Sequence, residues 1–127
     1  MHAELTEQGR PFTETFARLP AEKRAHILRV AKRVFARKGY AVASINEVAR
    51  EAGVSVGGLY RYFPTKDDLL LTVIESGVET LEAALEEAMS DARDPLERIE
   101  AVVRAAILHA TRDPEMVRIY IAGTPHG

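Results

Sequence analysis

The sequence contains no cysteine at any of its 127 positions. This absence excludes disulfide bonds, thiol nucleophiles and cysteine-based zinc sites, and it is compatible with a reducing cytoplasm. No apolar run approaches the roughly 20 residues that a membrane-spanning helix needs. The first twelve residues, MHAELTEQGRPF, lack the apolar core of a signal peptide. We therefore expect a soluble cytoplasmic protein without a membrane partner.

Residues suited to catalysis or metal binding are also sparse. The four histidines do not have the spacing of a Ser/His/Asp triad or of a metal site; they are His2, His26, His109 and His126. The pair His109 and Asp113 lies four residues apart and could contact a ligand or a metal, but a surface or capping role is the favoured interpretation. The sequence predicts no enzyme activity, no metal and no cofactor.

An uneven distribution of charge is the first positive feature. Residues 20–66 carry ten Lys and Arg against three Asp and Glu, whereas residues 67–127 carry five against thirteen. The formal net charge of −2 therefore hides a basic half joined to an acidic half. Such a division favours a surface for a polyanion beside a body that avoids it, although charges that simply decorate solvated helices are the alternative.

Apolar periodicity and capping residues predict helices along most of the chain and no strand, so the expected fold class is all-α. Residues 1–19, with Gly9 and Pro11, show weak periodicity and are interpreted as a flexible arm. Residues 20–66 are expected to form a three-helix head, and residues 67–127 part of a helical body. Apolar residues expected to face inward in the body are Leu69, Leu70, Val73, Ile74, Leu81, Leu85, Met89, Leu96, Ile99, Val103, Ile107 and Ala110.

Two short predicted helices within the head match the helix-turn-helix pattern. Ser44 begins the first helix as its N-cap, with Glu47 placed to complete a capping box. Gly53 supplies the left-handed conformation that reverses the chain, and Ser55 caps the second helix. The N-terminal end of this second helix is expected to enter the major groove of DNA.

Two adjacent glycines, Gly57 and Gly58, lie on the exposed side of the second helix. Each lowers the stability of the helix by roughly 1 kcal/mol relative to alanine. Their presence suggests that the backbone approaches DNA closely. Arg61 could pair with guanine or with a phosphate, and Ser44 and Ser55 are caps first, with phosphate contact as an added role. Tyr60 either contacts phosphate or packs with only its hydroxyl exposed. The exposed candidates are Val56, Gly57, Gly58, Arg61 and Tyr62, with Tyr60 and Lys66 as further phosphate contacts.

The stretch from Gly39 to Leu70 resembles the signature of the TetR family of transcriptional regulators. The matching elements follow in order: a glycine-aromatic pair, A-x-x-A-G-V-S, G-x-L-Y-x-Y-F and K-x-x-L-L. The resemblance covers about residues 22–75 and implies a DNA-binding head on a helical body that binds a small-molecule inducer. Such proteins dimerise on palindromic operators, usually repress, and release DNA when ligand moves the helix at residues 65–92.

The resemblance also implies individual site residues. A pocket for an inducer of unknown identity is expected between the long helix and the segments after it, near Ile74, Val78, Val103 and Ile107. Relatives usually carry a side chain where this sequence has Gly58, and often histidine where it has Tyr62. The positions matching DNA contacts in the family are Ser44, Ser55, Val56, Gly57, Tyr60, Arg61, Tyr62 and Lys66.

The length of the chain departs from the family pattern. Family members typically continue for several more helices, including those that form the dimer interface and close the ligand pocket. We therefore expect a fragment or truncated product, or a different assembly, with a homodimer if dimerisation helices are present. Apolar sides of the helices at 95–112 and 114–122 would then need a partner. The alternative function is an interaction module that pairs with a full-length relative without binding an operator productively.

Overall fold

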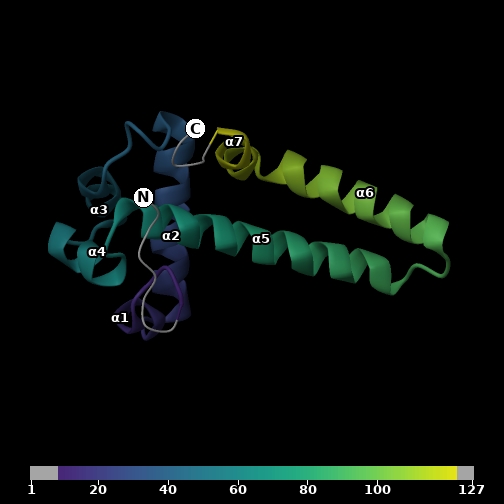
Figure 1. Cartoon of the computed structure of the whole chain (residues 1–127), viewed down its shortest axis with the longest axis horizontal. Coiled ribbons are helices and arrows are strands. Elements are labelled where there is room, and N and C mark those ends of the chain that lie inside the picture. Colours follow the sequence, from purple (N-terminus) through teal and green to yellow (C-terminus); the bar gives the residue numbers. More distant parts are fainter. Residues whose placement is uncertain (1–8, 123–127) are drawn as a thin grey trace.

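The computed structural model describes residues 9–122, and every regular element within them is a helix. This confirms the all-α prediction. Figure 1 shows a compact head formed by the first four helices, from which two long helices extend as a hairpin before the last helix returns to the head. No helix among residues 9–122 is long and apolar enough to cross a membrane. The elements are α1 (Glu14–Ala17), α2 (Ala21–Lys38), α3 (Ile45–Ala52), α4 (Val56–Tyr62), α5 (Lys66–Ser90), α6 (Pro95–Arg112) and α7 (Pro114–Ala122).

Helix α2 forms the centre of the head and packs against α3, α5 and α7. Its buried side chains recur every three or four residues, which is the period of one helix face. Leu59 and Phe63 from α4 and the turn after it, together with Leu69 from α5, are fully buried in the same core. The buried residues of α2 are Ile27, Val30, Ala31, Val34, Phe35 and Ala36.

The predicted caps and turn of the helix-turn-helix are present. Ser44 Oγ accepts a hydrogen bond from the Glu47 backbone N–H at 3.1 Å, and Ser55 Oγ accepts one from the Gly58 N–H at 2.9 Å. Gly53 adopts the left-handed conformation, with φ 75° and ψ 27°, where other residues are strained. These local interactions end α3 and begin α4 at the residues that the sequence indicates.

The start of α5 is fixed by a complete capping box. The Thr65 backbone N–H donates to Asp68 Oδ2 at 3.0 Å, and the Asp68 N–H donates to Thr65 Oγ1 at 3.1 Å. Asp68 is fully buried and Thr65 is exposed, so the two reciprocal bonds are partly shielded from solvent. Both hydrogen bonds of the box are formed, so the first turn of α5 is capped on both sides.

The prediction of a flexible arm is wrong for residues 9–19, and residues 1–8 lie outside the described part of the chain. Phe16, on α1, is only 3% exposed and packs against the rings of Tyr62 and Phe63, with centroids 5.9 and 4.7 Å apart. The Thr13 backbone N–H donates to the Tyr62 carbonyl at 3.0 Å. A segment this short shows little periodicity, and its partners lie nearly 50 positions away, so its sequence alone does not reveal its packing.

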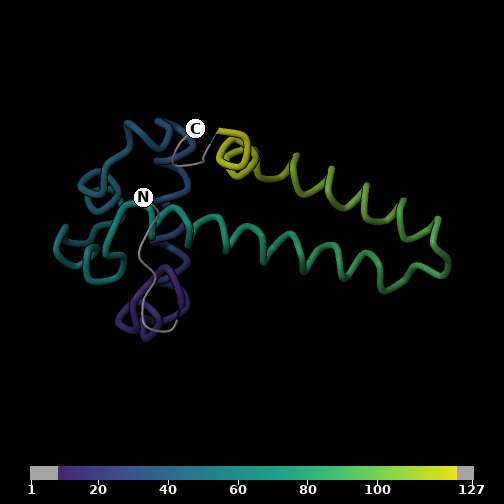
Figure 2. Tube along the Cα trace, in the orientation of Figure 1, coloured from purple at the N-terminus to yellow at the C-terminus, as the bar shows by residue number. Residues whose placement is uncertain are grey.

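The inward placement of α6 side chains is also wrong. Helix α6 packs along α5, as the trace in Figure 2 shows, but no residue of α6 is fully buried. Four of the five predicted inward residues are exposed, Leu96 65%, Ile99 62%, Val103 51% and Ile107 59%, and Ala110 is half-buried. One neighbouring helix covers only one face of α6, and small residues such as Ala101 and Ala105 are the half-buried ones there. Helical periodicity therefore finds the apolar stripe without showing what covers it.

Candidate nucleic-acid interface

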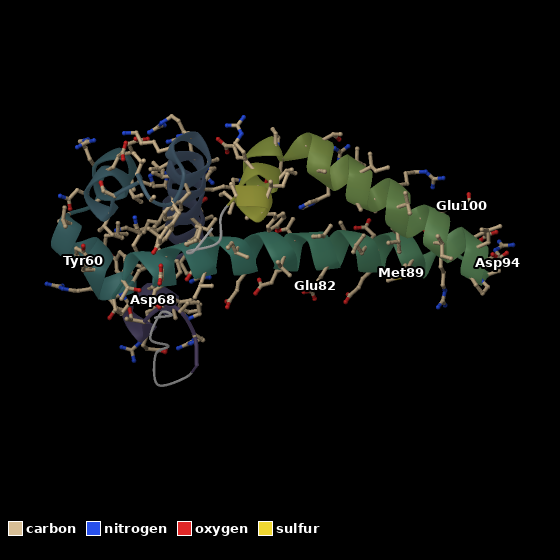
Figure 3. The ribbon with its side chains drawn as sticks, turned by 45° about the horizontal axis from the view of Figure 1, so that its top comes forward. Tyr60, Asp68, Glu82, Met89, Asp94 and Glu100 are labelled. Carbon is tan, nitrogen blue, oxygen red and sulfur yellow. The ribbon has the colours of Figure 1, made fainter. Side chains whose placement is uncertain are left out.

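Helix α4 is anchored on one side and open on the other. Leu59 and Phe63 are fully buried and fix the helix to the core of the head. The opposite side carries Tyr60, which is 46% exposed, and Val56, which is 38% exposed. Figure 3 shows Tyr60 on the outer side of the head, away from the α5–α6 hairpin. This placement leaves a complete face of α4 available to a partner.

The two glycines of α4 have different structural surroundings. A Cβ atom at Gly58 would lie 2.9 Å from Ser55 Oγ, the oxygen that caps the helix. A Cβ atom at Gly57 would meet no heavy atom within 4 Å. Among the described residues, an added side chain would therefore meet a neighbour at Gly58 but not at Gly57. An exposed helical glycine costs roughly 1 kcal/mol relative to alanine, and no contact within the described residues explains Gly57.

Most basic residues at the end of α2 are already paired with α3. Lys38 Nζ lies 2.5 Å from a Glu47 carboxylate oxygen, and Arg37 Nη2 lies 2.7 Å from Glu51. Arg61, in contrast, is exposed and has no side-chain hydrogen bond or ion pair within residues 9–122. Arg61 therefore places an unpaired positive charge on the exposed side of α4.

Glu47 remains ionised because of these cations. The hydrogen bond from Lys38 holds the pKa of Glu47 below its usual value, against the opposing effect of burial. Arg37 and the Ser44 backbone N–H add smaller contributions in the same direction. The carboxylate thus ties α2 to α3 and fixes the first helix of the helix-turn-helix.

Arg50 is a candidate that the sequence interpretation did not include. It lies in the last turn of α3, is exposed, and has no ion pair among the described residues. Helical spacing alone could have indicated this exposure, because Arg50 lies on the same side of α3 as the polar residue Asn46, four positions earlier. A second unpaired cation on the helix-turn-helix is suited to a phosphate contact.

The two tyrosines of α4 differ in burial. Tyr62, which the sequence predicts to be exposed, is half-buried, because its ring packs against Phe16 at 5.9 Å between centroids. Tyr60 is exposed, so the half-buried alternative for Tyr60 does not apply. The Tyr62 backbone carbonyl accepts the Thr13 N–H, and the Arg61 carbonyl accepts Thr13 Oγ1 at 2.5 Å. Thr13 therefore satisfies carbonyls at the C-terminal end of α4, which a helix leaves unpaired.

Lys66 is held within the protein. Its Nζ donates to the Tyr40 carbonyl at 2.6 Å and to the Ala43 carbonyl at 3.1 Å, and it lies 4.2 Å from the centroid of the Tyr40 ring. An ammonium group has three donors, so these bonds leave one for another acceptor. Lys66 thus joins α5 to the loop before α3, and the predicted phosphate contact would have to use its one remaining donor.

Replacement of Lys66 with alanine is expected to lower the free energy of unfolding by about 1–3 kcal/mol, because two charge-assisted hydrogen bonds are lost. Urea unfolding measures this change. The slope of log affinity against log salt concentration should change by clearly less than the one unit expected for a lost phosphate contact. Lys23→Ala removes an exposed positive charge of α2 and serves as the control for the loss of charge alone. A full unit of slope together with unchanged stability would make Lys66 a phosphate contact instead.

The four predicted pocket residues do not form one buried site. Ile74 is half-buried, Val78 is 36% exposed, and Val103 and Ile107 are more than half exposed. The cavity between α2, α5 and the α6–α7 corner is lined by other residues. Within residues 9–122, no group of three or more His, Asp or Glu side chains could hold a metal ion.

Comparison with known proteins adds independent information. A family model described as "Bacterial regulatory proteins, tetR family" matches residues 27–73. The HTH-type transcriptional regulator HbdR of Aromatoleum sp. (strain CIB) is 35% identical over 101 residues, a match that covers 78% of this chain and 44% of HbdR. The HTH-type transcriptional activator FasR of Mycolicibacterium smegmatis is 34% identical, with 80% of this chain and 47% of FasR covered.

The fold is also similar to solved structures. A TetR family transcriptional regulator from Chloroflexus aurantiacus superposes with a TM-score of 0.72 and 31% sequence identity. The match covers 85% of this chain and 50% of that protein. The chain thus spans about half the length of the relatives that it matches.

Proposed function

Because the chain belongs to the tetR family of bacterial regulatory proteins, we propose that it is a transcriptional regulator that binds double-stranded DNA through α4. One observation carries this proposal: the outer face of α4 has Gly57, Tyr60 and Arg61 exposed without internal partners, while Leu59 fixes its inner face. The proposed role is regulatory rather than catalytic, and a DNA target places the protein in the cytoplasm.

The proposed binding mode follows from the geometry of α4. Its N-terminal turn enters the major groove, where Gly57 allows the backbone to approach the base edges. Arg61 pairs with guanine, and Val56 offers an apolar contact to a thymine methyl group. Tyr60 and the helix N-termini capped by Ser44 and Ser55 are suited to phosphates, as is the hydroxyl of the half-buried Tyr62.

Assembly and control are part of the same proposal. We propose a repressor that binds a palindromic operator as a homodimer and is released by a small molecule. The relatives are about twice as long as this chain, so they have room for further helices that would complete a dimer. Helix α5 runs without interruption from the head into the hairpin, so a ligand that shifts α5 would also shift α4 (Figure 1).

Salt dependence on random duplex DNA tests the proposed function. Neutralising phosphates releases counterions, so affinity should fall steeply as the salt concentration rises. Selection from a random DNA pool should then yield a palindrome, because a symmetric dimer binds a symmetric site. If neither salt-dependent binding nor a selected sequence is observed, the DNA-binding proposal is wrong. Pairing with a full-length relative would then be the function to examine.

Replacement of Arg61 with alanine is expected to weaken binding to the selected sequence by roughly 10- to 100-fold, the equivalent of about 1–3 kcal/mol for a base contact. Binding to random DNA should weaken less, because only the specific complex contains the guanine contact. Fluorescence anisotropy at fixed salt measures both. Arg98→Ala on α6 is the matched control and should change neither. Equal losses on both DNAs would assign Arg61 to a phosphate.

A further inference from the structure

A cavity of about 230 Å³ lies between the head and the hairpin. Helix α2 contributes Arg29 and Lys32 to its wall, and the α6–α7 corner contributes His109 and Asp113. Its volume is below the roughly 300–1,000 Å³ of pockets for drug-sized ligands. It therefore suits a small ligand or the head group of a longer one. Apolar side chains complete the wall: Leu28, Val73 and Met116.

The single carboxylate of the cavity is already paired. Lys32 Nζ donates to Asp113 Oδ2 at 2.9 Å, and the Met116 backbone N–H donates to Asp113 Oδ1 at 3.1 Å. Burial acts to raise the pKa of Asp113, but these hydrogen bonds hold it below its usual value. Asp113 is thus an ionised, neutralised group that also caps α7, so both of its oxygens are in use.

The groups of the cavity that remain unpaired can all donate hydrogen bonds. His109 Nε2, which donates when it carries the proton, has no hydrogen-bond partner and is shielded from solvent, which is costly unless a partner arrives. Arg29 has no ion pair within the described residues, and Lys32 retains two further N–H donors. An anionic oxygen ligand complements this set, because charge-assisted hydrogen bonds are the stronger ones.

The cavity continues into a groove of about 630 Å³ between α5 and α6. The two share Thr80, His109 and Asp113, so they meet at the α6–α7 corner. Beyond that corner the middle of the groove is apolar, with walls formed by Ala84, Ala88, Ala105 and Leu108, and Arg112 lines it at the C-terminal end of α6. Its other end carries the acidic side chains Glu87 and Asp91. Because the positive groups lie at α2 and the acidic groups at the opposite end, an anionic head group is favoured near α2 and a hydrocarbon tail beside the alanines.

We propose that this site binds a carboxylate with a linear hydrocarbon tail. The carboxylate lies against His109, Lys32 and Arg29, and the tail lies in the groove lined by Ala84 and Ala105. The effect of this ligand on DNA binding rests on the proposed regulatory function. A bound carboxylate would contact both α2 of the head and the α5–α6 hairpin, and could therefore change how they sit together. Binding itself requires no DNA.

The chain-length dependence of carboxylate binding tests the proposal. Butyrate, hexanoate and octanoate are titrated into the full chain without DNA, by calorimetry and by amide NMR shifts. Affinity should rise about fourfold for each buried methylene. Octanamide should bind roughly tenfold more weakly than octanoate, and octylamine more weakly still. No binding of octanoate, or equal affinity for octanamide, would overturn the proposal.

Matched variants locate the ligand. His109→Leu should weaken octanoate binding about tenfold, and His109→Gln, which keeps a donor, should stay within about threefold of the native affinity. Ala84→Leu fills the groove and should remove the dependence on chain length. Ala83→Leu, on the exposed side of α5, should leave it intact. Equal effects of Ala83→Leu and Ala84→Leu, with both variants folded by circular dichroism, would contradict the assignment.

The site and the proposed function can fail separately. A chain that binds octanoate but shows no salt-dependent DNA binding would retain the site and lose the regulatory proposal. A chain that binds DNA but not octanoate would lose only the site. If both hold, saturating octanoate should change the DNA affinity, and the same factor should appear in the octanoate affinity when DNA is bound.

Discussion

Replacement of Gly57 with leucine is expected to weaken operator binding by about 100-fold or more, because the side chain would occupy the space through which α4 approaches the base edges. The free protein should be at least as stable as the native one. A Cβ atom at Gly57 meets nothing within 4 Å, and a helical glycine is less stable than leucine by somewhat under 1 kcal/mol. Anisotropy with operator DNA and urea unfolding measure the two effects.

Gly58→Ala is the control for this substitution. Its Cβ would crowd Ser55 Oγ at 2.9 Å, so part of the cap energy, about 0.5–2 kcal/mol, should be lost and should offset the roughly 1 kcal/mol that alanine gains over glycine in a helix. The two adjacent glycines should thus differ: Gly57→Leu loses DNA binding while stability rises, whereas Gly58→Ala gains little or no stability. Native affinity in Gly57→Leu would show that α4 is not the helix that reads DNA.

Replacement of Phe16 with alanine is expected to lower the free energy of unfolding by about 3–5 kcal/mol. Phe16 is 3% exposed and packs against the rings of Phe12, Tyr62 and Phe63, so the truncation leaves a cavity under the end of α4. Domains of this size are stable by only about 5–15 kcal/mol, so a large part of that stability is lost. DNA binding should decline with it, and urea unfolding measures the loss.

Two further substitutions separate packing from hydrogen bonding at this place. Phe12→Ala, at a half-buried ring, should cost clearly less than Phe16→Ala. Thr13→Val keeps the volume but removes the hydroxyl that donates to the Arg61 carbonyl, so its effect should be about 1 kcal/mol. A loss below 1 kcal/mol for Phe16→Ala would mean that residues 9–19 form the loose arm that the sequence suggests.

The predicted helix-turn-helix depends on interactions between close neighbours, and this explains why it could be predicted. Ser44 and Ser55 each cap a backbone N–H three residues later, and Gly53 needs only its own freedom to adopt positive φ. A cap or a turn of this kind is encoded within four residues. The all-α class and most helix ends follow from the same local rules.

The candidate site could be predicted only in part, because residue type does not say whether a side chain already has a partner. Lys66 was expected at phosphate, but its Nζ is bound by carbonyls 23 and 26 positions earlier. Tyr62 was expected to be open, but Phe16 covers it. The body shows the same limit, since Ile99 and Val103 belong to an apolar stripe that no described element buries.

The sequence by itself therefore determined the helices from residue 20 onward, most of their caps, the turn at Gly53 and helix α4 with its two glycines. Tertiary structure alone decided which exposed groups remain free: Arg61 is open, whereas Lys38 is paired across α2 and α3. It also brought Thr13 to the end of α4 and joined Lys32 to Asp113, 81 positions apart. The physical reason is sequence separation. Caps and turns form between residues close in sequence, whereas burial and ion pairing depend on segments that meet only after the chain has folded.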